Sequence, residues 1–298
     1  TSCRSRHQNG QGSCPCLNNK PDSVGSLPSH RSSRRHLLVQ HDHHYPHLGS
    51  LTKNLSTDSW HDFGVTQLTP GTQEWLDQVV EDIVEPELPI LDPHHHMWPQ
   101  GQGLPYTRND LHRDAGAGHN VVKTIFMECG SAYNREAPEH LRSLGETKYI
   151  ADQALSDPNP LIAGIVSHID LRRDDRDELL DMHVEASRGL FRGISDALAI
   201  ATHPEAMMIP GHSMKDLYLD PAFRRGVARL GERGFTYDSW HYHHQNREFL
   251  DLARATPGTT MILDHFGTPV GVGPYATQRD EIFEQWKKDI AEIAKCPN

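Results

Sequence analysis

Residues 72–298 alternate between short apolar runs typical of strands and longer runs with helical periodicity. We expect strands at residues 89–96, 121–129, 161–170, 191–194, 235–242 and 259–265. Helical segments are expected at residues 137–155, 174–188, 213–232, 245–255 and 277–295. The last of these shows the pattern clearly, because apolar residues recur at spacings of three and four from Ile282 to Ile293. Such alternation indicates a mainly parallel sheet covered by helices.

The start of the chain has a different pattern. Residues 1 to about 70 are rich in Ser, His, Arg, Asn and Gly, and show neither a helical nor a strand period. A segment with so few apolar residues cannot bury enough surface to offset the entropy of ordering it. We therefore expect a disordered, low-complexity head over residues 1–70 and one α/β domain over residues 71–298.

Composition narrows the partners and the compartment. The net charge of -11 argues against nucleic acid, since phosphate binding needs a basic face. No apolar run approaches the ~20 residues of a membrane helix, and no secretory signal is recognisable. The five cysteines are an odd number without zinc or thioredoxin spacing, which favours free thiols in a reducing compartment. These features predict a cytoplasmic protein that binds neither nucleic acid nor membranes, and they leave its oligomeric state open.

Polar side chains stand at the ends of the predicted strands. They are His94 and His96, Glu128, His168 and Asp170, Arg192, His243, and His265. Side chains alternate along a strand, so a His-x-His pair places two imidazoles on the same side. Such a pair forms half of a metal site or a cationic grip on an anionic substrate. Because sites of βα barrels gather at the carboxyl ends of the strands, we expect these groups to converge there.

Several of these residues also have simpler structural interpretations. A single strand-end histidine such as His168 is more often a satisfied structural group, and we place it outside the site. His95 lies between two inward positions, so alternation points it away from them. Glu128 could order a neighbouring loop, and Asp170 could cap the following helix. His243 is flanked by two further histidines, so the choice among the three stays open.

These motifs together resemble the amidohydrolase-related family, in particular its branch of lactonases and dicarboxylate hydrolases. The resemblance rests on LDPHHHMW (91–98), FMECG (126–130), HIDL (168–171), FRGI (191–194), YHHQ (242–245) and DHFGTPVG (264–271). It covers the whole patterned region, residues 72–298, and none of the head. It implies a distorted (β/α)8 TIM-type barrel that hydrolyses lactones or cleaves related carboxylated rings.

The resemblance also implies roles for particular residues. The catalytic histidines would be His94, His96, His243 and His265. One divalent metal ion, such as zinc, would bind to His94, His96 and His265, although members of this branch can work without a metal. Substrate contacts would come from Arg192, Glu128 and Trp98. The family commonly has Arg-Gly-Ile-Arg after the fourth strand, and Ser195 stands in the last of these places here.

Lactone hydrolysis needs an activated water, stabilisation of the oxyanion and a grip on the substrate carboxylate. A zinc ion would supply the first two, and the guanidinium of Arg192 suits the third. The family's general base, an Asp after the eighth strand, has no match, and we expect it beyond residue 298. The chain would then hold about six of eight βα units, with an open seam that makes it poorly soluble and nearly inactive. A metal-dependent decarboxylase and an inactive fragment are the alternatives.

Overall fold

The computed structural model describes residues 72–102, 106–207, 209–211 and 213–298. All of them belong to the second of two units of the chain, His47–Asn298. The predicted head lies outside the described residues. Cys129 and Cys296 carry free thiols, as predicted. Among the described helices, none is long and apolar enough to cross a bilayer.

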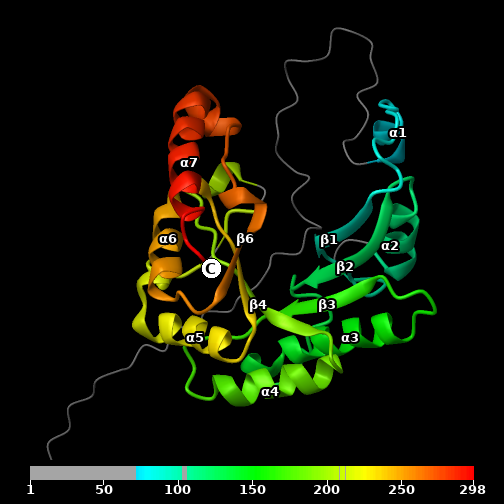
Figure 1. Ribbon diagram of the computed structural model, residues 1–298, viewed down its shortest axis with the longest axis horizontal. Helices are drawn as coiled ribbons and strands as arrows, with labels where there is room; N and C mark the ends of the chain where they lie inside the picture. The colour runs from blue at the N-terminus through cyan, green and yellow to red at the C-terminus, as the bar shows by residue number, and fades with distance from the viewer. Residues whose placement is uncertain (1–71, 103–105, 208, 212) are drawn as a thin grey trace, which may run out of the picture. The chain divides into compact units, whose positions relative to one another are not determined.

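Six strands form one parallel sheet in the described part of the chain, in the sequential order β1 to β6. The strands are β1 (Pro89–His95), β2 (Asn120–Met127), β3 (Ile162–Ser167), β4 (Phe191–Ala197), β5 (Thr236–Trp240) and β6 (Thr260–Leu263). The sheet curls, and helices follow the strands in alternation (Figure 1). This confirms the predicted α/β fold, a partial TIM-type barrel with six strands.

The helices are α1 (Gln73–Leu76), α2 (Arg108–Ala115), α3 (Ser143–Leu155), α4 (Arg176–Ser187), α5 (Pro221–Glu232), α6 (Asn246–Ala255) and α7 (Arg279–Ile293). Helix α2 was not expected, because its residues are mostly polar and only Leu111 is buried. Helix α5 begins later than predicted, because the carboxylate of Asp220 accepts hydrogen bonds from the first-turn amides and Pro221 stands at the first helical position.

The core has two main parts, both formed between strands and the helices that cover them. The larger contains Ile169, Leu171, Leu180, Ile194, Val227, Tyr237 and Phe249. The second contains Met97, Leu111, Phe126, Ile150 and Ile165. Burial of these apolar side chains holds the helices against the sheet. The polar side chains lie at the carboxyl ends of the strands.

The curl of the sheet brings its two edge strands together at their carboxyl ends. Strands β1 and β6 form no ladder with each other. Even so, Nδ1 of His94, in β1, lies 3.3 Å from Oδ1 of Asp264, which directly follows β6. The first and the last strand of the sheet therefore contribute to one site.

Candidate active site at the carboxyl ends of the strands

Strand β1 contains a bulge at Pro93 and His94. Between Asp92 and His95 it has one more residue than the facing part of β2. Pro93 lies in this bulge, where no amide hydrogen is needed for the ladder. The Asp92 carboxylate accepts a hydrogen bond from the amide of His94 at 3.1 Å and so fixes the irregular turn of the chain. The bulge sets the direction in which the next side chains point.

The imidazoles of His94 and His96 converge, with their Nε2 atoms 3.3 Å apart. Nδ1 of His96 lies 2.9 Å from the carbonyl oxygen of Met127. Because a carbonyl only accepts, this nitrogen carries the proton and Nε2 carries a lone pair. Burial lowers the pKa of His96, so the ring is neutral. Asp264 in turn faces Nδ1 of His94 and favours the same tautomer there. Two lone pairs then face each other, an arrangement that a shared proton or cation stabilises.

His265 approaches the pair from the β6 side. Its ring centroid lies 4.7 Å from that of His94, with an interplanar angle of 46°. The residue belongs to the turn η6 (Asp264–Gly267), in which His265 and Phe266 both have a φ of 52°. A left-handed backbone costs a non-glycine residue about 1–2 kcal/mol, and such strain is common at functional sites. Burial and the neighbouring His94 lower the pKa of His265.

A second polar group comes from the ends of β2, β3 and β4, and consists of Glu128, His168 and Asp196. Nδ1 of His168 lies 3.0 Å from Oδ1 of Asp196 and 3.2 Å from the carbonyl oxygen of Ser195. Burial by itself lowers the pKa of His168, but the hydrogen bond and charge of Asp196 raise it to about 10. Burial also raises the pKa of Asp196, against the effect of His168. The short contact favours the ionised pair at neutral pH.

Glu128 stands beside this ion pair. Burial raises the pKa of its carboxyl group, and the positive charge of His168 opposes that rise. Two further acids complete the inner wall. Asp238 is buried in β5, and burial followed by the charge of Asp264 raises its pKa to about 7. One carboxylate oxygen of Asp264, Oδ2, is buried without a hydrogen-bond partner. The site therefore combines imidazoles with four carboxyl groups.

The remaining predicted site residues have different outcomes. The ring of Trp98 lies 5.9 Å from that of His96, at the same end of the sheet. His243 is not on a strand, since β5 ends at Trp240 and the turn η5 (His243–Gln245) follows. Its ring packs on Tyr275, and its Nδ1 accepts from the amide of Val270, in the loop after His265. No described contact joins His243 to the other three predicted catalytic histidines.

The expectation that Arg192 lies near the histidines is wrong. Arg192 is the second residue of β4, at the opposite end of the strand from the site. Its guanidinium donates hydrogen bonds to the carbonyl oxygens of Gly189, Phe191 and Ala163. The prediction failed because β4 was expected to end at residue 194, whereas it continues to residue 197. With the longer strand, Asp196 stands at the carboxyl end.

The sequence prediction missed Asp196 on β4, Asp238 on β5 and the contribution of His168 to the site. Continuing the strand alternation from Ile194 by two positions would have selected Asp196. His168 was set aside as structural, and its partner was unknown. By contrast, His241, which was left open as an alternative to His243, is fully buried. Its two ring nitrogens contact the Tyr218 hydroxyl at 2.6 Å and Oδ1 of Asn246 at 3.0 Å.

The pair His94 and His96 fits a divalent metal ion. Two nitrogen ligands of a tetrahedral zinc ion, each about 2.0–2.1 Å from the metal, are about 3.3–3.4 Å apart. The observed 3.3 Å between the Nε2 atoms matches this spacing. Within the described residues, however, no group of three His, Cys, Asp or Glu side chains closes on one ion. His265 is therefore close to the pair without completing a three-ligand set.

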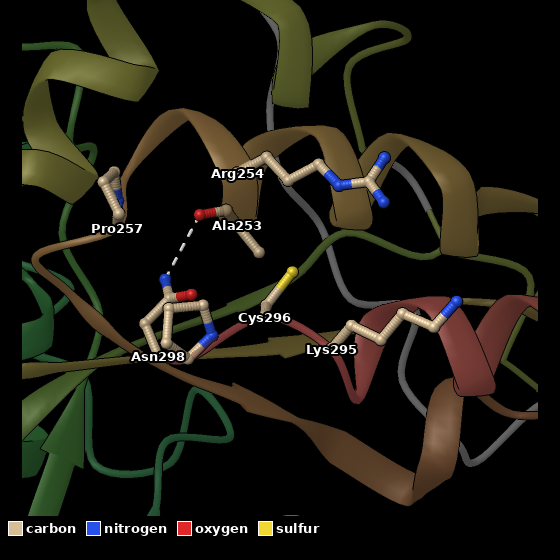
Figure 2. A pocket seen from close by; sticks show the side chains of 7 residues that line it. Ala253, Arg254, Pro257, Lys295, Cys296 and Asn298 are labelled. Atoms are coloured by element: carbon tan, nitrogen blue, oxygen red, sulfur yellow. Dashed lines mark hydrogen bonds between the residues drawn. The ribbon is translucent and has the colours of Figure 1, made fainter.

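A hollow lies at the other end of the sheet. A cavity of about 230 Å³ is lined by the end of α6 and the last residues of the chain, including Arg254, Cys296 and Asn298 (Figure 2). The Asn298 side chain donates to the carbonyl oxygen of Ala253 at 3.2 Å, and the Asn298 carbonyl accepts from the amide of Met261. This hollow adjoins the amino end of β6, the face where barrels carry stability and not catalysis.

Comparison with known proteins agrees with this geometry. The sequence model of the amidohydrolase family matches residues 91–298, so the chain belongs to the amidohydrolase family. An uncharacterized protein, y4mH, from Sinorhizobium fredii (strain NBRC 101917 / NGR234) is 30% identical over 233 residues, and the match covers 71% of this chain and 71% of that protein.

Two crystal structures of an amidohydrolase from Burkholderia multivorans are also similar. The structure with bound zinc has a TM-score of 0.52 and 21% identity, over 70% of this chain and 66% of that chain. The structure with bound HEPES has a TM-score of 0.51 and 20% identity, over 70% of this chain and 67% of that one. At these identities the likeness shows the fold. The chain spans just under two thirds of the length of the zinc-bound relative.

Proposed function

We propose that this protein is a hydrolase that adds water to the ester carbonyl of a small lactone at the carboxyl ends of β1 and β6. The observation that carries this proposal is the 3.3 Å approach of the His94 and His96 Nε2 atoms. Membership of the amidohydrolase family supports a hydrolytic reaction. The zinc bound to a structure of the same fold supports a divalent ion as the cofactor.

His94 and His96 would hold the ion. When bound, a zinc ion supplies Lewis acidity towards the carbonyl and a more acidic water. Asp264 and the Met127 carbonyl face the outer nitrogens of the two rings, which keeps each ring oriented and its inner nitrogen free to bind. His265 offers a neutral imidazole beside them, able to accept or donate a hydrogen bond at the reacting group.

The rest of the site determines which substrates fit. Trp98 gives a flat apolar surface beside His96, suited to one face of a ring. The guanidinium of Arg192 bonds to backbone carbonyls at the far end of β4, so the proposal assigns it no contact with the substrate. The proposed substrate is a small lactone. If the lactone carries a carboxylate, groups other than Arg192 bind it.

The test measures lactone ring opening by the purified chain in zinc-containing buffer. A pH indicator reports the acid that ring opening releases. The substrates are γ-butyrolactone, δ-valerolactone, dihydrocoumarin and a carboxylated 2-pyrone. We expect turnover of at least one of them, and a loss of most activity in His265→Ala. The exposed His119→Ala is the matched control. Rates equal to the uncatalysed reaction for all four substrates would refute the proposed function.

A further inference from the structure

We propose that Trp240 and Trp286 are positioning residues, whose indole N–H groups hold the turn η6 so that the ring of His265 stays against that of His94. The inference rests on the proposed hydrolase function, in which His265 offers a neutral imidazole at the reacting group. Neither tryptophan contacts the reacting atoms in this assignment. Both act through the backbone of the turn that carries His265.

The turn has a backbone conformation that needs support from outside. The consecutive residues from His265 to Thr268 all have a positive φ, with values of 52°, 52°, 66° and 37°. Gly267 adopts such a φ without cost, but its three neighbours in this run carry a Cβ, for which the left-handed region is unfavourable. A conformation of this kind persists when the surrounding structure determines it. The contacts made by neighbouring elements therefore decide where His265 lies.

Trp286 ties the turn to helix α7. Its indole Nε1 donates a hydrogen bond to the carbonyl oxygen of Phe266 at 2.6 Å. The ring stacks on that of Phe283, three residues earlier in the same helix, with the centroids 5.3 Å apart and an interplanar angle of 19°. Because the stack fixes the plane of the indole and an indole has a single N–H, the donor points in one direction. The peptide group that follows directly after His265 and Phe266 is thereby held by a regular helix.

Trp240 ties the other end of the turn to strand β5. It is the last residue of that strand, and its Nε1 donates to Oγ1 of Thr268 at 3.0 Å. The amide of His243, in the segment that follows β5, donates to the carbonyl oxygen of Thr268 at 3.3 Å. Thr268 is therefore held through both its side chain and its main chain. The two indoles bind the turn on either side of Gly267.

Gly267 rests on a fixed side chain of helix α6. A Cβ at this position would lie 2.2 Å from Oδ1 of Asn246, so the backbone of the turn packs directly on that amide. Asn246 is fully buried, and the same Oδ1 lies 3.0 Å from Nε2 of the buried His241. The turn therefore cannot shift towards α6. The two indoles hold it against a rigid support.

The position of His265 depends on this support because its ring is not anchored directly. In the described part of the chain, no hydrogen bond holds the imidazole itself, whose ring centroid lies 4.7 Å from that of His94. His94, by contrast, has its amide bonded to Asp92 and its Nδ1 facing Asp264. A displacement of about 1 Å at a reacting group can cost about 100-fold in rate. Loosening the turn should therefore impair the reaction without changing any group that contacts the substrate.

The first experiment measures kcat and KM of the zinc-loaded full chain, with whichever of the four lactones the parent opens fastest. Trp286→Phe and Trp240→Phe keep an aromatic ring and remove the N–H donor. We expect kcat to fall about 10- to 100-fold in each variant, with little change in KM, because neither tryptophan contacts the substrate. Trp75→Phe changes an exposed tryptophan outside the sheet, and this matched control should keep the parent values.

Variants of the acceptor side separate positioning from general support of the fold. Thr268→Ser keeps the hydroxyl group that Trp240 bonds to and should retain the parent kcat. Thr268→Val removes the hydroxyl group and should lower kcat as Trp240→Phe does. In a His265→Ala background, Trp240→Phe should cause no further fall, because the ring that it positions is gone. A further fall of the same size there would show that Trp240 does not act through His265.

A second measurement does not depend on turnover. The rings of His94 and His265 are close enough for a nuclear Overhauser effect between their ring protons in the metal-free chain. This signal should be present in the parent and in Trp75→Phe, and weak or absent in Trp286→Phe, Trp240→Phe and Thr268→Val. An unchanged signal in all three folded variants would overturn the inference.

The outcomes separate this inference from the proposed function. Turnover by the parent chain, together with an unchanged kcat in folded Trp286→Phe and Trp240→Phe, overturns the positioning role and leaves the hydrolase function standing. A parent chain that opens none of the four lactones overturns the hydrolase function. The ring-to-ring signal then decides by itself whether the two indoles hold His265 against His94.

Discussion

The buried carboxyl group of Asp238 makes the stability of the fold depend on pH. Its pKa is raised from 3.8 to about 7, first by burial and then by the charge of Asp264. The folded state thus holds this proton more tightly than the unfolded state, so its contribution to stability declines as the pH rises from about 4 to 7. We expect Asp238→Asn to stabilise the protein, by about 2 kcal/mol more at pH 8 than at pH 5. Urea unfolding at both pH values measures this, and an equal effect at both would contradict it.

The left-handed turn after β6 predicts two opposite effects at neighbouring positions. Phe266 has a φ of 52° and is 73% exposed, so Phe266→Gly relieves backbone strain with little loss of packing. We expect a gain of up to about 1 kcal/mol in the free energy of unfolding. Gly267→Ala should destabilise, because its Cβ would lie 2.2 Å from Oδ1 of Asn246. Thermal unfolding of both variants tests this, and a lower melting temperature for Phe266→Gly would contradict the strain.

Helix α3 fixes the loop that follows β2 through a single buried side chain. The carboxyl group of Glu146, 1% exposed, accepts hydrogen bonds from the amides of Cys129 at 3.2 Å and Ser131 at 2.7 Å. Glu146→Ala leaves both buried amides without an acceptor, at a cost of about 1–3 kcal/mol for each. We expect a loss of about 2–4 kcal/mol in chemical unfolding, against little change in the exposed control Glu139→Ala. Equal stabilities for the two variants would show that the loop does not need this contact.

The elements were largely predictable because each signal is local. Apolar runs located all six strands, and the alternation with helices required them to be parallel. Strand ends were less predictable, because they depend on pairing with a neighbour. Strand β4 extends to Ala197, which pairs with Trp240 of β5. The error displaced the predicted polar group of that strand from Asp196 to Arg192.

The candidate site shows the same division. The pair His94 and His96 was predictable from two-residue spacing at a strand end, although a bulge and not regular pleating sets its direction. The contact between His94 and Asp264 was not predictable, because the curl of the whole sheet brings β1 to β6. His168 was judged alone, and its importance comes from Asp196 on the adjacent strand.

At the scale of the whole molecule, β1 is an edge strand of the sheet that the described residues form, and exposed apolar side chains lie on it and just before it. Leu88 and Leu91 are 53% and 52% exposed. An unpaired edge of this kind invites pairing with another chain. We expect concentration-dependent self-association in analytical ultracentrifugation, and a shift towards monomer in Leu91→Lys. Val80→Lys changes an exposed valine outside the sheet and serves as the control. A parent chain that is monomeric at all concentrations would contradict this expectation.

The most direct test of the proposed site is a zinc titration of the metal-free protein, with the rate of dihydrocoumarin ring opening as the readout. His94 and His96 are the pair whose spacing fits the ion, so the rate should rise with added zinc and level off at about one ion per chain. In His96→Ala the same titration should leave the rate near that of the uncatalysed reaction. A parent rate that is unaffected by zinc, or a His96→Ala variant that responds like the parent, would contradict the assignment of this pair as the working centre of the protein.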